Sequence, residues 1–190
     1  MNDVLAKLFG SAARVKILRL FLANKSEKFE IDVIAKRTKV QKPTVRKELN
    51  ALVKIKLLKA AGAAKQRIWA VNMDFEYLKA LDNLLLGAGG TDSGFIAKKV
   101  TGAGNVKLVV VTGVFMPDAD ETEVDMLVVG DKLIKRKLDS AIGDIEASLG
   151  RELRFALFGT EDFNYRMNIG DRLVRDVFEF PHEIIVDKLG

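Results

Sequence analysis

The fold is decided by residues 29–72, FEIDVIAKRTKVQKPTVRKELNALVKIKLLKAAGAAKQRIWAVN. Apolar residues at helical spacing predict a helix over 32–38 and a second one over about 42–55. Residues 29–31, ahead of the first helix, fit either a short strand or a hydrophobic staple. Pro43 fits the first turn of the second helix, where no backbone N–H is needed. The side of that helix predicted to be buried carries Val45, Leu49, Leu52 and Val53.

The flanking sequence extends this pattern on both sides. Two short runs with strand character, 57–60 and 67–71, predict an antiparallel hairpin whose tip is basic. Upstream, apolar residues recur at helical spacing over 4–22, with a soft interruption at Gly10 and Ser11. This upstream segment is therefore either one bent helix or two helices.

Helix, helix, turn, helix and hairpin is the element order of a winged helix, whose third helix enters the major groove of DNA. We therefore predict that residues 1–74 are a winged-helix DNA-binding domain. The outward face of the third helix would contact bases and phosphates, and the hairpin would meet the backbone or the minor groove. The side chains assigned to these contacts are Gln41, Lys42, Thr44, Arg46, Lys47 and Asn50 in the helix, with Lys65 and Arg67 in the hairpin. The alternative is an amphipathic helix whose polar face is merely solvated.

Charge is distributed unevenly along the 190 residues. Residues 1–74 carry 17 Lys/Arg and 6 Asp/Glu, a net charge of +11, whereas residues 75–190 carry 14 and 20, a net charge of −6. The basic half indicates a polyanionic partner, which we take to be double-stranded DNA. A domain that is basic only for solubility is the alternative.

The absence of cysteine excludes disulfides, thiolate nucleophiles and Cys-ligated metal centres.

The N-terminal stretch is charged at Asp3, Lys7 and Arg14, which argues against a signal peptide or a membrane span. No later stretch has the roughly eighteen consecutive apolar residues that a membrane helix needs. We therefore expect a cytoplasmic protein with no membrane partner. The one histidine, His182, follows Pro181 and has no nucleophile or carboxylate pattern near it, so we expect it to be structural.

The rest of the chain predicts a connector and a second domain. Residues 75–91 are expected to form the connection, a helix over 75–87 followed by a glycine-rich joint at 87–90. The part of the helix over 76–86 is the favoured seam of a homodimer, and the alternative is a plain connector buried on one side. The leucines expected to face inward are Leu78, Leu81, Leu84 and Leu85. Strands that alternate with helices over 92–190 predict a small α/β domain with a mixed sheet, its central strands covered on both faces. The strands are expected around 108–111, 126–129, 153–158 and 183–186, and the helices over 132–149 and in a stretch ending at 178.

Two segments, LFGSAARVKILRLFLAN and FEIDVIAKRTKVQKPTVRKELNALVKIKLLKA, resemble the winged helices of ArsR-like bacterial and archaeal regulators. The resemblance covers residues 4–72. It implies operator binding as a homodimer, with paired half-sites about one DNA turn apart. Metal sensing through cysteine cannot be carried over, because the chain has none.

The segment LVVVTGVFMPDADETEVDMLVVGD is similar to the opening of a polymerase-β-type nucleotidyltransferase domain. The resemblance implies that Gly113 forms the nucleotide-binding turn. It also implies that Glu123 and Asp125, at alternate positions of a strand, hold divalent ions such as Mg²⁺. The chain departs from the family where Val114 replaces the serine that cradles phosphate, and where the strand at 153–158 supplies no third acid. This incomplete set favours two surface acids over catalysis.

These features together predict a DNA-binding transcriptional regulator without a resident cofactor. Its degenerate nucleotidyltransferase-like domain would serve dimerisation, partner contact or sensing. One alternative is an active metal-dependent nucleotidyltransferase delivered by the winged helix, and another is an interaction scaffold that binds no nucleic acid. Binding of Mg²⁺, a nucleotide or another small molecule at the degenerate site also stays open.

Overall fold

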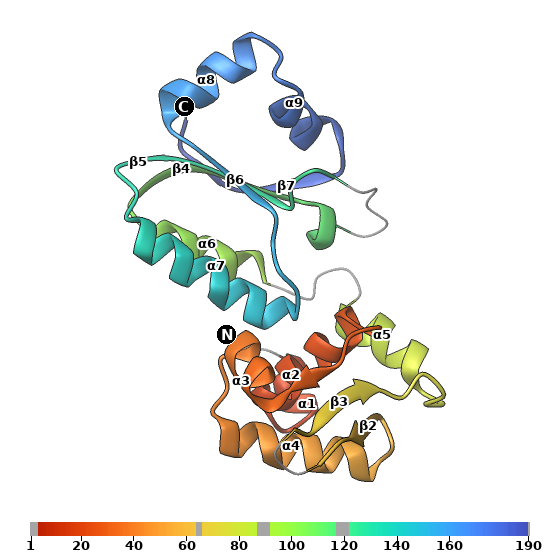
Figure 1. The fold of residues 1–190 in the computed structure, drawn as a ribbon. Helices are drawn as coiled ribbons and strands as arrows, with labels where there is room; N and C mark the ends of the chain where they lie inside the picture. The colour runs from red at the N-terminus through yellow and green to blue at the C-terminus, as the bar shows by residue number, and fades with distance from the viewer. Residues whose placement is uncertain (1–3, 64–65, 87–91, 117–121, 190) are drawn as a thin grey trace. The chain divides into compact units, whose positions relative to one another are not determined.

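The computed structural model describes residues 4–63, 66–86, 92–116 and 122–189 (Figure 1). These residues form two compact units. The first consists of the described residues before position 88 together with Glu146–Arg151, and the second of the described residues between 92 and 145 and from Glu152 onward. The predicted joint at 87–90 and the hairpin residue Lys65 lie outside the described residues. No helix in the described part of the chain is long and apolar enough to cross a membrane.

The first unit begins with two helices, α1 (Val4–Leu8) and α2 (Ala12–Ala23). They are separate because Gly10 has a φ of 69°, in the left-handed region that interrupts an α-helix. Ser11 then caps α2, and its side-chain oxygen accepts a hydrogen bond of 3.1 Å from the backbone N–H of Arg14. Of the two alternatives for this segment, two helices are confirmed.

The segment that decides the fold contains the elements expected of it. In order they are β1 (Phe29–Glu30), α3 (Ile31–Thr38), α4 (Lys42–Lys54), β2 (Leu58–Ala61) and β3 (Ile68–Val71). β3 lies between β1 and β2 and pairs antiparallel with both, so the predicted hairpin is confirmed. α3 ends at Thr38, and the next residue, Lys39, has a φ of 52°, in the left-handed region that commonly terminates helices.

The core of the first unit lies where α2 packs against α3 and α4. Ile17, Ile34 and Leu49, one from each helix, are fully buried there. Phe21 and Phe29 meet edge to face with ring centroids 5.4 Å apart, which joins β1 to α2. Because this packing buries one face of α4, the opposite face is left to solvent.

The connecting helix, α5 (Leu78–Leu86), begins later than the expected position 75. Leu78 and Leu85 are buried and Leu81 is half-buried, as predicted. The prediction for Leu84 was wrong, because its side chain is 48% exposed. Positions 78, 81 and 85 form a stripe at helical spacing, and position 84 lies about a quarter of a turn away from the centre of that stripe.

The second unit contains a four-stranded sheet, in the order β6-β5-β4-β7 over the described residues. Its strands are β4 (Asn105–Thr112), β5 (Met126–Asp131), β6 (Phe155–Phe158) and β7 (His182–Asp187). β4 is antiparallel to β5 and β7, whereas β5 and β6 are parallel. The predicted mixed sheet is therefore confirmed.

Helices cover both faces of this sheet. α6 (Ser93–Thr101) and α7 (Lys135–Leu149) lie on one face, and α8 (Thr160–Asn168) and α9 (Arg172–Glu179) lie on the other (Figure 1). Successive residues of a strand point to opposite faces, and Val109 and Val110 of β4 are both fully buried, as expected for a covered central strand. Only two apolar positions of α6, Ile96 and Val100, are buried. Two positions are too few for the helical period to be recognised in the sequence. α7 begins at Lys135 rather than 132.

Asp131 joins the end of β5 to the start of α8. Its carboxylate accepts hydrogen bonds from the backbone N–H and the hydroxyl of Thr160, at 3.0 and 2.7 Å. Because these bonds favour the ionised form, they hold the pKa of Asp131 below its usual value. They fix the point at which the chain leaves the sheet for α8.

Candidate functional site

The polar face of α4 is the first candidate site. Gln41 precedes the helix, Pro43 occupies its first turn, and the inward positions Val45 and Leu49 are fully buried. This packing fixes the rotation of the helix and turns its polar residues outward. All six helix residues predicted to contact DNA are exposed: Gln41, Lys42, Thr44, Arg46, Lys47 and Asn50.

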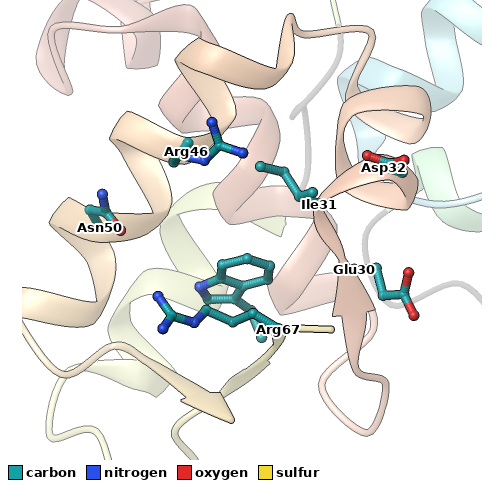
Figure 2. A pocket seen from close by; sticks show the side chains of 7 residues that line it. Glu30, Ile31, Asp32, Arg46, Asn50 and Arg67 are labelled. Atoms are coloured by element: carbon teal, nitrogen blue, oxygen red, sulfur yellow. The ribbon is translucent and has the colours of Figure 1, made fainter. Parts of the chain in front are cut away.

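A hollow of about 240 Å³ lies beside this face (Figure 2). α4 contributes Arg46 and Asn50, and Arg67 reaches the same hollow from the chain just ahead of β3 (Figure 2). Its other lining residues are Glu30, Ile31, Asp32 and Trp69. The structure therefore brings two predicted residues of the helix together with one of the hairpin, while Lys65 lies outside the described residues.

The charges at this surface are largely available to a partner. Within the described part of the chain, Arg46, Lys47 and Arg67 form no ion pair, and all three are exposed. Lys42 instead pairs with Asp32, with Nζ 2.7 Å from Oδ1. Exposed guanidinium and ammonium groups of this kind can bind phosphate, and arginine can also read a guanine edge.

An ion pair beneath the surface holds α4 in place. Arg14 of α2 donates from Nε to Oε2 of Glu48 at 2.8 Å, and from Nη1 to the carbonyl oxygen of Phe9 at 3.1 Å. Glu48 is the one buried acid of α4. It therefore acts as a positioning residue that ties α4 to α2.

The second candidate site is the pair of carboxylates in the second unit. The chain over 122–125 is not a strand, because β5 starts only at Met126. The prediction that Glu123 and Asp125 share one face of a strand was therefore wrong. Glu123 is 56% exposed, with an oxygen 3.7 Å from an Arg172 nitrogen, whereas Asp125 is 1% exposed. The interpretation of both as surface acids fails for Asp125.

Protein donors surround the Asp125 carboxylate. Arg154 donates from its backbone N–H and Nε to Oδ2 at 3.0 and 3.2 Å, and from Nη2 to Oδ1 at 3.0 Å. The backbone N–H of Val114 donates to Oδ1 at 3.4 Å. Gly113, with a φ of 52°, passes so close that a Cβ there would lie 2.5 Å from the same oxygen. Gly113 thus allows the turn to close over Asp125.

This arrangement does not fit a divalent ion. Both oxygens of Asp125 already accept hydrogen bonds from an arginine and from backbone groups, and the space beside Gly113 is filled by Asp125 and the Thr122 hydroxyl. In the described ranges, no group of three His, Asp or Glu side chains is placed to hold a metal. Arg154 supplies the positive charge that a metal would supply to this carboxylate.

His182 is placed as a structural residue would be. Its Nδ1 lies 2.8 Å from the carbonyl oxygen of Phe180, and its ring meets Phe178 edge to face at 5.5 Å. No role beyond packing the start of β7 follows from these contacts.

Several residues at the two sites could not be recognised in the sequence. Arg154 lies 29 positions from Asp125, and nothing in the local sequence marks the two as partners. Glu30, Asp32 and Trp69 reach the hollow only because β1 pairs with β3.

No protein-family model, no curated protein and no solved structure matches this chain. The two surfaces are therefore interpreted from their own chemistry.

Proposed function

We propose that the first unit is a winged-helix domain that binds double-stranded DNA, and that the chain regulates transcription. The observation that carries the proposal is the exposed polar face of α4, bordered by the hollow that Arg67 also lines (Figure 2). The major groove, about 12 Å wide, admits an α-helix. The net charge of +11 over residues 1–74 supplies the attraction to phosphate.

Roles can be assigned within this surface. Arg46 and Asn50 lie one helical turn apart and are proposed to read base edges, since arginine pairs with guanine and asparagine with adenine. Lys42 and Lys47 are proposed to bind phosphates, and Arg67 the neighbouring backbone or minor groove. Gln41, Thr44 and Lys65 complete the proposed set.

We further propose that the second unit is a nucleotidyltransferase-like domain without transferase activity, used for dimerisation, partner contact or sensing. This rests on the closed hydrogen bonding of Asp125, which leaves neither of its oxygens for a nucleotide-bound ion. A two-metal mechanism needs both ions aligned by a complete ligand set.

Replacing Arg46 or Lys47 by alanine should weaken binding of duplex DNA by the full chain. If either residue contacts a base, the loss should be about 1–3 kcal/mol and concentrated at one position of the operator. The measurement is fluorescence anisotropy of a labelled duplex at fixed salt. Lys98→Ala, which removes one exposed charge from α6, outside α4, the hairpin and α5, is the matched control. Unchanged affinity in both α4 variants would move the interface elsewhere.

The full chain should be a homodimer, because paired half-sites let two small reading surfaces add their contacts. α5 is the proposed seam, and its exposed Leu84 is available to a partner copy. Light scattering should give twice the chain mass of 21.0 kDa. Leu84→Glu should give monomers, while Leu157→Glu, at an exposed leucine of β6, should not. A monomeric parent chain, with and without DNA, would refute the dimer.

No labelled product should form when the full chain is incubated with any nucleoside triphosphate and Mg²⁺ or Mn²⁺. The physical reason is that nucleotidyl transfer depends on ions that neutralise phosphate charge, and Asp125 is held by Arg154 instead. Turnover that disappears in Glu123→Gln would establish the alternative of an active enzyme. Because the Glu123 side chain is exposed, this substitution should not disturb folding.

A further inference from the structure

The ion pair between Lys42 and Asp32 lies at the edge of the proposed DNA-binding surface. Lys42 is the first residue of α4, and Asp32 lies in the first turn of α3. Their charged atoms are 2.7 Å apart, and both side chains are more than half exposed. The pair is therefore formed at the surface and not in the core.

Both members of the pair are close to the residues proposed to bind DNA. Asp32 lines the hollow together with Arg46 and Arg67 (Figure 2). Lys42 lies four positions before Arg46 on α4, which places the two side chains on neighbouring turns of one face. A phosphate that approached Arg46 would therefore also be within reach of Lys42, were Lys42 not already paired.

We propose that Asp32 competes with DNA phosphate for Lys42 and thereby limits the affinity of this surface for duplex DNA. The inference rests on the proposed DNA binding and adds a residue that restrains it. Lys42 must leave Asp32 before it can neutralise a phosphate. The free energy needed to break the ion pair is therefore subtracted from the free energy gained in the phosphate contact. Bases read by other residues are unaffected, so the restraint acts on sequence-independent attraction.

The size of the effect follows from the exposure of the pair. Exposed ion pairs hold little free energy, so Asp32→Asn should tighten DNA binding by about two- to fivefold. Because Lys42 reaches a phosphate in both proteins, the slope of log affinity against log salt concentration should steepen by less than one, through the salt dependence of the broken ion pair alone. The gain should shrink as salt is raised, because screening weakens both the pair and the phosphate contact.

The test is a double-mutant cycle on the full chain, measured by anisotropy with a labelled duplex at several salt concentrations. The gain from Asp32→Asn should be lost when Lys42→Ala is already present, because no ammonium group remains to be released. A gain that persists without Lys42, or no gain at all, would overturn the competition.

Asp74→Asn is the matched control. Asp74 forms a comparable exposed pair with Lys59 at 3.1 Å, but neither residue lines the hollow. An equal gain in Asp74→Asn would mean that total charge, and not the Lys42 pair, sets the affinity. If the parent chain binds no duplex at any salt concentration, the proposed function fails. If the parent chain binds duplex DNA and Asp32→Asn binds it with the same affinity, only the proposed competition fails.

Discussion

The affinity of the full chain for duplex DNA should fall by about a hundredfold when monovalent salt rises from about 50 to about 200 mM. The proposed set of DNA-binding residues offers four phosphate ligands, Lys42, Lys47, Lys65 and Arg67. If about four phosphates are neutralised, the slope of log affinity against log salt is about −3.6. Counterions released from DNA on binding are the physical cause, and more contacts would make the fall steeper.

The measurement is a titration of one labelled duplex at four or five salt concentrations. Lys47→Ala should reduce the slope by about one, while Lys98→Ala on α6 should leave it unchanged. Affinity that is independent of salt would contradict binding through this basic surface. A steep slope that is unchanged in Lys47→Ala and Arg67→Ala would mean that the chain binds polyanions through another face.

Asp125→Ala should lower the free energy of unfolding of the second unit by about 2–4 kcal/mol. The substitution removes the acceptor of three hydrogen bonds from Arg154 and one from Val114. The two backbone N–H groups then lose their partner, and a void opens beside Gly113. The Arg154 side chain is 55% exposed and can be solvated, which keeps the loss below that of a fully buried pair.

This effect can be measured separately for the two units. Trp69, the one tryptophan, lies in β3, so its fluorescence during urea unfolding reports the first unit. Hydrogen exchange at the amides of β4 and β5 reports the second unit. Glu123→Ala is the control and should cost little, because that side chain is exposed. Equal protection of β4 and β5 in Asp125→Ala and the parent chain would contradict the structural role.

Much of the fold follows from local patterns in the sequence. The period of Val45, Leu49 and Leu52 predicts α4, and the exposure of Arg46 follows directly, because it lies on the opposite face. The alternating order of strands and helices after position 92 predicts a mixed sheet covered on both faces. Such features depend on a few neighbouring residues, so they can be recognised without a structure.

Other features depend on contacts between distant parts of the chain. Leu84 has the same side chain as Leu85, and only the packing of α5 decides which of the two is buried. The hollow beside α4 needs the pairing of β1 with β3, because that pairing brings Glu30 and Asp32 opposite Arg46. Register and pairing across long loops are not written in any short stretch of sequence.

Glu123 and Asp125 show most clearly the difference between what the local sequence determines and what only tertiary contacts decide. By itself the sequence determined the apolar periods and two acids with one residue between them, together with the uneven charge of the two halves. Only the tertiary structure decided that Asp125 is buried against Arg154 while Glu123 is exposed. The physical reason is that a buried carboxylate must find partners, and the partner here comes from the chain entering β6, 29 positions away.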